Sequence, residues 1–367
     1  MTRLEDIAAK RYVAGPSRNL MVPTSELPEA QRTEADGMMG LIARLAPQAR
    51  TIMGMAYDSS LIEVGRAMGL VGPDREPLWT FETGYKAGGW LVPDEWVLND
   101  SYWGGSPLSV VSYSRSVDES GTADELKRKG VLHTHADRPY AAPYVYNFYD
   151  REGGPAGNCM SQSKIDAMPS VASNIAVMVD STFRPGVLRL LRATAGAEDQ
   201  NRPPVSRKTN IVFMAHLDHP GQANDGLSGV AVLVALHNWI RQQQEEYGRK
   251  FKYTYEFVIV PESIGSACYL SRRTPGYGNV LGAVVLDLVG GRGHLLLQHS
   301  LQHATDRPAP YIDRVMEYAA AMREPAFAVA PYRAVVRGDD ANLNGPRYRI
   351  PTVVLARWPF AEYHTSD

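Results

Sequence analysis

The chain has 367 residues, of which 44% are apolar and 21% are charged. This mixture can bury a large core and excludes a disordered chain. The 38 basic residues nearly balance the 40 acidic ones, so the net charge is −2. We therefore expect neither a nucleic-acid partner nor a polybasic contact with a membrane. The chain has two cysteines, no apolar run near the length of a membrane span and no continuous apolar stretch at its start. These features predict a cytoplasmic protein without a disulfide framework.

The pattern of apolar residues in the first 168 residues changes at about residue 76. Apolar residues recur at helical spacing in Glu29 to Leu45 and in Leu61 to Met68. From residue 76 onward, short segments rich in aromatic residues are broken by Gly and Pro. We therefore predict a small β-rich domain over residues 76–168, inserted into a larger domain formed by residues 1–75 and 169–367. The aromatic residues between Trp79 and Trp103 could cover a functional site or form a core of their own.

After residue 170, predicted strands alternate with helices. An amphipathic helix is predicted over Val230 to Gln244. Strands are predicted over Ile175 to Val179, Asn210 to Ala215, Tyr255 to Val260, Ala283 to Leu286 and Thr352 to Ala356. This alternation predicts an α/β fold around a largely parallel sheet.

Polar residues follow these predicted strands or precede the predicted helix. They are His216, Asp225, Glu262, Asp287 and, in the C-terminal segment, His364. In open α/β sheets, sites form beyond the carboxyl ends of the strands. We therefore expect two imidazoles and two carboxylates to meet there, with one further carboxylate nearby.

Such nitrogen and oxygen ligands suit zinc, and three or four of them leave room for a water. Zinc lowers the pKa of that water and polarises a substrate carbonyl. A glutamate that is not a ligand can then accept the proton and pass it to a leaving amine. Asp218 is placed two residues after His216, where it can hold the second ring nitrogen.

Other polar residues have alternative interpretations. His133 and His135 resemble a metal-binding pair, but they fall in the predicted β domain and also suit an exposed loop. His219 could compete with His216 as a ligand, although Pro220 after it suggests a turn. Cys268 lies on an apolar helical face, which favours a buried core residue over a nucleophile.

The sequence resembles the zinc aminopeptidases of the glutamate carboxypeptidase and transferrin receptor superfamily. Four segments carry the resemblance: His216 to Asp218, Asp225 to Gly229, Leu286 to Gly290, and His364 with Thr365. Within that superfamily the chain is most similar to a bacterial aminopeptidase-like branch that often carries a winged helix. The segments for this branch are Trp90 to Trp96, Pro139 to Tyr144, His219 to Asp225, Pro261 to Gly265 and Tyr363 to Asp367.

The resemblance implies a three-layer aminopeptidase-like fold of the zinc exopeptidase type, with a mostly parallel mixed sheet, helices on both faces and an inserted small β-rich domain. It assigns zinc to His216, Asp225 and His364, with Asp287 as a further ligand, and the role of general base to Glu262. The two-zinc enzymes have adjacent carboxylates where this chain has Glu262 and Ser263. Ser263 removes one ligand, which favours one zinc over two. The chain also ends at Asp367, so we expect no winged helix and no nucleic-acid role from one.

The function expected from these residues is zinc-dependent hydrolysis of a peptide or aminoacyl amide bond by a metallopeptidase-like enzyme. Two alternatives remain open. One is a single-zinc deacylase, amidohydrolase or cyclase that acts on a small biosynthetic intermediate, and the other is an inactive binding protein on the same fold. The expected partner is a small peptide or aminoacyl amide, and the sequence does not decide between a monomer and a homo-oligomer.

Overall fold

The large sheet of the computed structural model has eight strands, in the order β1-β9-β11-β10-β12-β15-β13-β14. The model describes residues 28–70, 78–102, 109–148, 150, 152–168, 174–197, 210–273, 280–324, 326–360 and 362–366. The strands of this sheet are β1 (Leu78–Glu82), β9 (Val187–Gly196), β10 (Asn210–His216), β11 (Thr254–Val260), β12 (Val280–Leu286), β13 (His294–Gln298), β14 (Ala328–Ala330) and β15 (Thr352–Trp358). The central strands β11, β10, β12 and β15 run parallel, whereas β9 and β13 flank them antiparallel.

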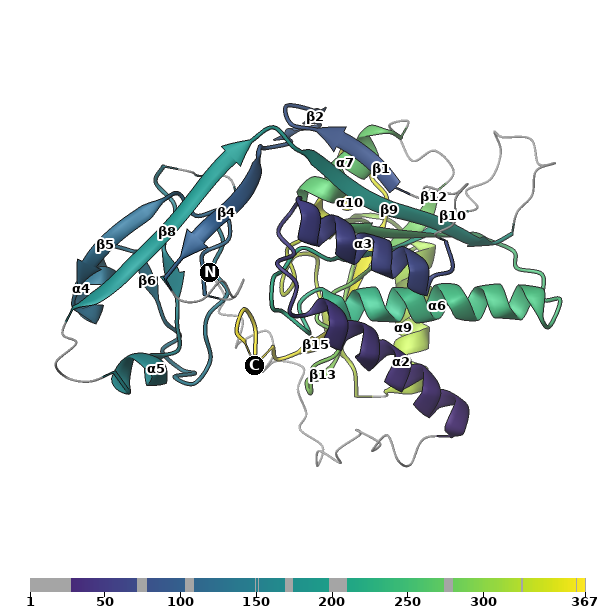
Figure 1. The fold of residues 1–367 in the computed structure, drawn as a ribbon. Helices are drawn as coiled ribbons and strands as arrows, with labels where there is room; N and C mark the ends of the chain where they lie inside the picture. The colour runs from purple at the N-terminus through teal and green to yellow at the C-terminus, as the bar shows by residue number, and fades with distance from the viewer. Residues whose placement is uncertain are drawn as a thin grey trace.

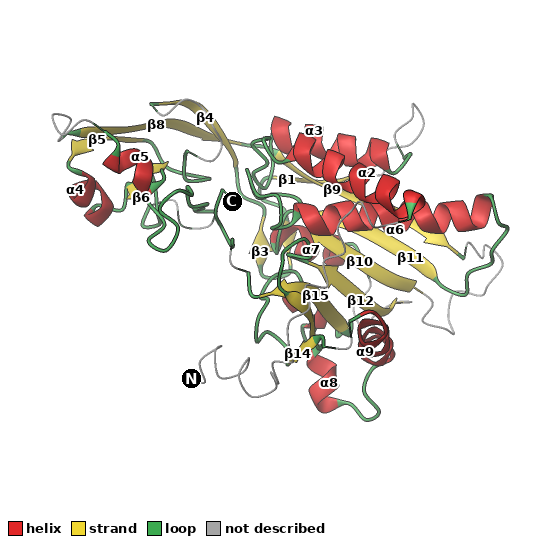
Figure 2. Ribbon diagram, turned by 90° about the horizontal axis from the view of Figure 1, so that it is seen from below, coloured by secondary structure: helices red, strands yellow, loops and turns green. Residues whose placement is uncertain are grey.

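Helices cover both faces of this sheet (Figures 1 and 2). One face packs against α2 (Glu29–Leu45), α3 (Met55–Ala67), α6 (Leu227–Glu245) and α9 (Tyr311–Arg323), and the other against α7 (Ile264–Ser271) and α10 (Asp340–Asn344). The short helix α8 (Leu301–Thr305) follows β13. Side chains along β11 alternate between the two faces. Phe257 and Ile259 enter one core, and Val258 and Val260 enter the other. The predicted three-layer α/β fold is thus confirmed.

A second, smaller region is built from short β-structure (Figure 1, left). Its three-stranded antiparallel sheet has the order β4 (Glu95–Ser101), β8 (Ile175–Arg184), β5 (Val117–Gly121). The pair β6 (Leu132–His133) with β7 (Asn158–Cys159) forms a separate ladder there, whereas the pair β2 (Lys86–Ala87) with β3 (Trp90–Leu91) packs beside α7 of the large region. The helices α4 (Ala123–Arg128) and α5 (Gln162–Asp166) complete the region. Buried residues of β5, β8 and α4 give it its own apolar core.

The strand pairing differs from the expected borders of the inserted domain at residues 76 and 168. β1 pairs with β9 from Leu78 to Glu82 and so extends the large sheet. β8, the longer form of the strand predicted at Ile175 to Val179, pairs with β4 and β5 in the small sheet. The reason is long-range pairing: β8 and β9 are separated by two residues and serve different sheets, which local periodicity cannot reveal.

Trp96 is one of the aromatic residues for which the sequence leaves open a cover of the site or a core, and it is partly buried against two apolar cores. Its indole stacks on Tyr113 with ring centroids 6.0 Å apart, and its N–H donates a hydrogen bond of 2.8 Å to the carbonyl of Ser114. Trp103 lies outside the described residues. These contacts of Trp96 favour the core alternative over a cover of the site.

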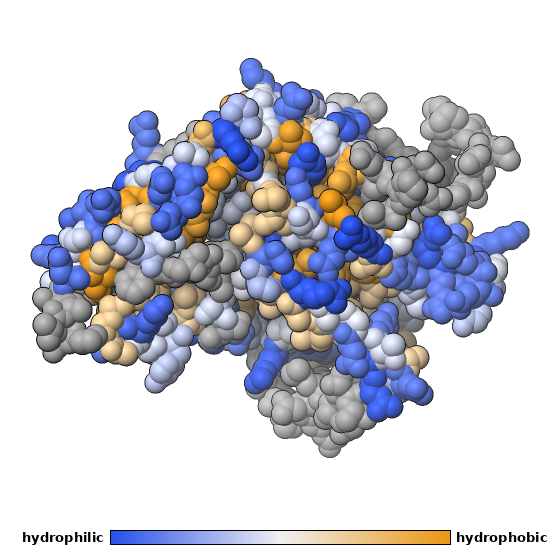
Figure 3. Space-filling model, viewed as in Figure 1, coloured by the Kyte–Doolittle hydropathy of each residue, from blue (hydrophilic) through white to orange (hydrophobic). Residues whose placement is uncertain are grey.

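Within the described residues, no helix combines the length and the apolarity needed to cross a membrane. The face shown in Figure 3 mixes hydrophilic residues with small, separate groups of hydrophobic ones.

Candidate metal centre

The predicted site residues lie at one edge of the large sheet because three parallel strands end there. His216 is the last residue of β10, Glu262 lies two residues after β11, and Asp287 directly follows β12. β10 lies between β11 and β12, so their carboxyl ends are adjacent. Asp225 reaches the same edge from the turn before α6.

Two glycines allow α6 to start close to this edge. Gly226 has a φ of +21°, and a Cβ there would lie 2.2 Å from the carbonyl oxygen of His216. A Cβ on Gly229 would lie 2.2 Å from the carbonyl oxygen of Leu286. Glycine is therefore required at both positions, and its absence of a side chain places Asp225 beside His216.

The Nε2 atom of His216 faces two carboxylates. It lies 3.1 Å from Oδ1 of Asp225 and 3.3 Å from Oδ1 of Asp287. Its other nitrogen, Nδ1, lies 3.4 Å from Oδ1 of Asp218. Asp218 is fully buried and also accepts a hydrogen bond of 2.8 Å from the backbone N–H of Glu262. Asp218 thus lies on the far side of the His216 ring from the two carboxylates, as a positioning partner of a ligand does.

Two further histidines approach Asp225 from other directions. Nδ1 of His219 lies 3.1 Å from Oδ1 of Asp225, and Nε2 of His364 lies 3.1 Å from its Oδ2. Nε2 of His219 lies 3.3 Å from Oε2 of Glu262. The structure therefore brings together all six residues selected from the sequence, and it adds His219.

Several of these atoms lack hydrogen-bond partners among the residues that the structure describes. They are Nδ1 and Nε2 of His219, Oδ2 of Asp225, and Nε2 of His364, all buried. Buried polar atoms are normally paired, and each unpaired one costs about 1–3 kcal/mol. Converging histidine nitrogens and carboxylate oxygens without mutual hydrogen bonds fit a divalent cation.

Electrostatics at the cluster favour positive charge. Burial alone would lower the pKa of His216, but the carboxylates of Asp218, Asp225 and Asp287 raise it well above its ordinary value. Burial would likewise raise the pKa of Asp225, but His219 and His216 hold it well below the usual range. The carboxylate of Asp225 therefore stays ionised, as a metal ligand must be.

Arg50 anchors the loop that carries Asp218 and His219. Its fully buried guanidinium donates hydrogen bonds to the carbonyl oxygens of Leu217, His219 (2.7 Å) and Gln222 (3.1 Å). Burial lowers the pKa of Arg50 to about 10 although Asp218 raises it, so the side chain remains charged at neutral pH. This distant residue turns the His219 segment inward, which explains why Pro220 does not direct it to the surface.

A segment of the small β region closes over the cluster. Tyr144 donates its backbone N–H to the carbonyl of His364 at 2.7 Å, and Ser366 donates its own to the carbonyl of Ala142 at 2.9 Å. The ring of Tyr144 lies 4.9 Å from that of His219 and 5.1 Å from that of His364, measured between centroids. Its hydroxyl is buried and has no hydrogen-bond partner within the described part of the chain. The small region therefore holds the His364 segment in place and brings a phenol to the site.

Other features lie apart from this cluster. His299, His303 and Glu317 form a second group with the residue types of a metal site, but Nε2 of His299 is already paired with Glu317 at 2.6 Å. Nε2 of His133 lies 3.0 Å from the carbonyl of Ala156 in the small region. Cys268 is fully buried in the apolar core, as predicted.

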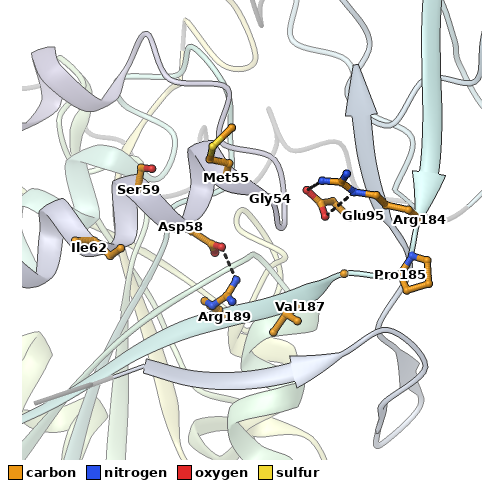
Figure 4. A pocket seen from close by; sticks show the side chains of 11 residues that line it. Gly54, Met55, Asp58, Ser59, Ile62, Glu95, Arg184, Pro185, Val187 and Arg189 are labelled. Carbon is orange, nitrogen blue, oxygen red and sulfur yellow. Dashed lines mark hydrogen bonds and ion pairs between the residues drawn. The ribbon is translucent and has the colours of Figure 1, made fainter. Parts of the chain in front are cut away.

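A pocket of about 460 Å³ lies at the joint between the two sheets (Figure 4). It contains the ion pairs of Asp58 with Arg189 and of Glu95 with Arg184. None of the residues that line it belongs to the histidine and carboxylate cluster. Its charged groups are paired with one another, so we assign it no part in the chemistry.

Comparison with known proteins agrees with this geometry. The family model described as a domain of unknown function, DUF4910, matches residues 39–367. The chain belongs to the DUF4910 family. A Clostridium acetobutylicum protein, named as a polysaccharide biosynthesis protein with an aminopeptidase-like domain, is 26% identical to this DUF4910 chain over 339 residues. The match covers 89% of this chain and 70% of that protein.

Solved structures show the same fold. A crystal structure named as a peptidase from Clostridium acetobutylicum superposes on this DUF4910 chain with a TM-score of 0.72 and 25% identity. It covers 94% of this chain and 78% of the other. A zinc aminopeptidase from Bacillus subtilis superposes with a TM-score of 0.55 and 12% identity, over 91% and 89% of the two chains. The predicted resemblance to zinc aminopeptidases is thus confirmed, and for the Bacillus enzyme the likeness is one of fold.

Proposed function

We propose that this DUF4910 chain is a zinc-dependent hydrolase of a peptide or aminoacyl amide bond. The observation that carries the proposal is the convergence of His216, Asp225 and Asp287 on one buried point, with Glu262 and His364 beside it. Three protein ligands and an open position are typical of catalytic zinc. The names of its relatives, a peptidase and a zinc aminopeptidase, support the same class of reaction.

A zinc ion bound by these residues would polarise the substrate carbonyl and make a water acidic. Glu262 follows β11 at the same sheet edge, where its carboxylate can accept a proton from the attacking water. The water oxygen bonds to the carbonyl carbon, the carbon–nitrogen bond breaks, and Glu262 returns the proton to the leaving amine nitrogen. Asp218 keeps the ring of His216 in one orientation during these steps.

Two tyrosines of the small region and one of the C-terminal segment are close enough to the cluster to contact a substrate. The unpaired hydroxyl of Tyr144 can donate a hydrogen bond to a substrate oxygen. Tyr146 is 38% exposed and Tyr363 is 47% exposed, and both rings lie within 6 Å of the His364 ring between centroids. Partly exposed aromatic rings beside a buried carboxylate cluster suit a small peptide or aminoacyl amide better than a macromolecule.

The test is hydrolysis of aminoacyl anilides and short peptides, compared with N-acyl amino acids, by the zinc-loaded protein. Glu262→Gln should keep its zinc and its fold but lose about 10²–10⁴-fold in turnover, because an amide cannot accept the proton. Asp225→Asn should lose zinc and activity together. The control is Glu119→Gln, since Glu119 forms an exposed ion pair with Lys129 far from the site.

Three results would contradict the proposal. A Glu262→Gln protein depleted of zinc would make Glu262 a ligand, and one that retains most of its activity would exclude Glu262 as the base. Turnover of the N-acyl amino acids alone would assign the site to a deacylase.

A further inference from the structure

A rare backbone turn follows Glu262, the residue to which we assign the role of general base. Ser263 has a φ of 62° and a ψ of −61°, and the backbone N–H of Ile264 donates a hydrogen bond of 2.6 Å to the carbonyl oxygen of Glu262. These angles and this hydrogen bond define a γ-turn with positive φ, which is strained for a residue that has a side chain. Such a conformation persists only where the surrounding contacts hold it.

Residues of α10 and its N-terminal end supply contacts on both sides of the turn. The backbone N–H of Ser263 donates to Oδ1 of Asp339 at 2.8 Å, and its carbonyl oxygen accepts from Nδ2 of Asn342 at 2.6 Å. Asn342 also donates to Oγ of Ser266 at 2.9 Å and accepts from Nε1 of Trp90 at 3.4 Å. These two further partners orient the amide of Asn342, so that its N–H group is directed at the carbonyl of the strained residue.

Gly338 faces the carboxylate of Glu262 directly before this segment. A Cβ at Gly338 would lie 2.7 Å from Oε1 of Glu262, and its next neighbours would be Cδ and Cγ of the same side chain at 3.6 and 3.7 Å. The other carboxylate oxygen, Oε2, lies 3.3 Å from Nε2 of His219. The carboxylate of Glu262 therefore lies in a space that stays open only because residue 338 has no side chain.

Two buried side chains hold the backbone around Gly338. Gln298 makes three hydrogen bonds of 3.0 Å with the backbone of residues 335–336. Oδ1 of Asp340 accepts a hydrogen bond of 3.1 Å from the N–H of Gly338. Gln298 is fully buried, and Asp340 is 1% exposed. A methyl group added at position 338 would therefore displace the flexible side chain of Glu262 rather than this backbone.

We propose that Asn342 and Gly338 are positioning residues for Glu262. Asn342 holds the strained turn that directs the side chain of Glu262 toward the cluster, and Gly338 leaves the space that the carboxylate occupies. The inference rests on the proposed function, in which Glu262 accepts the proton of the attacking water. The competing explanation is that both residues only stabilise the fold.

The main test is Gly338→Ala in the zinc-loaded protein. The φ of Gly338 lies outside the left-handed region, so alanine can adopt the same backbone conformation. We expect kcat to fall about 10²-fold with little change in KM and no loss of zinc, because a displaced base acts on the transition state rather than on substrate binding. Gly37→Ala is the matched control, since a Cβ at Gly37 would have no neighbour within 4 Å and should leave kcat unchanged.

Asn342→Leu tests the other half of the proposal. It removes the hydrogen bond to Ser263 without adding a charge, and it should lower kcat while the zinc content stays the same. Asn238→Leu is its control, because Asn238 donates a hydrogen bond of 2.9 Å to the carbonyl of Ala67 on the exposed side of α6. If thermal unfolding shows that Asn342→Leu does not fold, Gly338→Ala decides.

A double-mutant cycle separates positioning from a structural effect. Adding Gly338→Ala to Glu262→Gln should cause no further loss of turnover, because the carboxylate on which residue 338 acts is already absent. An equal further loss in the Glu262→Gln background would support the structural explanation and overturn the proposal. An unchanged kcat in Gly338→Ala alone would overturn it as well.

The crystal structure of zinc-loaded Gly338→Ala gives a readout that does not depend on activity. The carboxylate of Glu262 should move away from residue 338 while His216, Asp225 and Asp287 keep their positions, and an unmoved carboxylate would refute the positioning role. Failure of the proposed function gives a different result. In that case the wild type binds its zinc but cleaves none of the amides, and the position of Glu262 in the variant still decides whether Gly338 positions it.

Discussion

Replacing Arg50 with methionine should destabilise the protein by about 3–5 kcal/mol, the cost of breaking a buried charge network. The guanidinium donates four hydrogen bonds to buried backbone carbonyls, those of Leu45, Leu217, His219 and Gln222. Each carbonyl left without its donor costs about 1 kcal/mol. Asp218, the charged partner that raises the pKa of Arg50 most, would also lose this buried cationic neighbour. Methionine preserves the apolar stem, so lost packing contributes little.

The assay is urea unfolding followed by tryptophan fluorescence, in buffer with a chelator so that bound zinc does not contribute. Arg44→Met is the matched control. Arg44 lies in the same N-terminal region, and its ion pair with Glu63 has side chains that are 59% and 31% exposed, so its loss should cost less than about 1 kcal/mol. Equal effects of the two substitutions would refute the anchoring role of Arg50. A destabilised Arg50→Met protein that still binds zinc with wild-type affinity would show that the loop keeps its conformation without this anchor.

Two further predictions concern buried groups away from the site. Burial would raise the pKa of Glu256, but Arg273 and Arg192 lower it to about 2. The ionised Glu256 therefore contributes its full stabilisation of the folded state above pH 4.5, and this contribution is lost as the pH falls toward 2. Glu256→Gln should therefore cost up to about 3 kcal/mol at pH 7 and much less at pH 3 in urea unfolding, and an equal loss at both values would contradict this. Burial raises the pKa of Cys159 and Cys268 to about 12, so neither thiol should react with Ellman's reagent at pH 8 until the protein is denatured. Rapid reaction of the folded protein would show that the core opens.

The sheet and most of the site could be predicted because their signals are local. Apolar strands followed at once by polar residues mark the carboxyl edge, and parallel strands share that edge. The helix predicted at Glu29 to Leu45 has the observed bounds, and the helix predicted at Val230 to Gln244 lies within α6. His216, Asp225, Glu262 and Asp287 meet because each follows or precedes such an element.

The remaining features depend on contacts between residues far apart in the chain. The sequence leaves His219 open between a ligand and a turn before Pro220, and the hydrogen bond from Arg50, 169 positions earlier, holds its backbone beside the cluster. The position of Tyr144 depends in the same way on backbone hydrogen bonds to the His364 segment. The sequence assigns β8 to the large sheet because the residue pattern of a strand does not indicate which other strands it pairs with. There is nonetheless a local signal for His219, because it directly follows Asp218 and so continues the segment that carries two other site residues.

The connection from β8 to β9 also limits how this architecture can be varied. Only Pro185 and Gly186 separate the two strands, and the backbone at Gly186 is held by reciprocal hydrogen bonds with Thr83. A Cβ at Gly186 would lie 2.6 Å from Cβ of Glu95, so the joint is closely packed as well as short. An exchange of the small region between related proteins must therefore preserve the strand register on both sides of this joint. A single inserted residue that shifted the register there would turn every side chain of β8 or β9 to the opposite face of its sheet. The tyrosines beside the histidine and carboxylate cluster would then move with the small region.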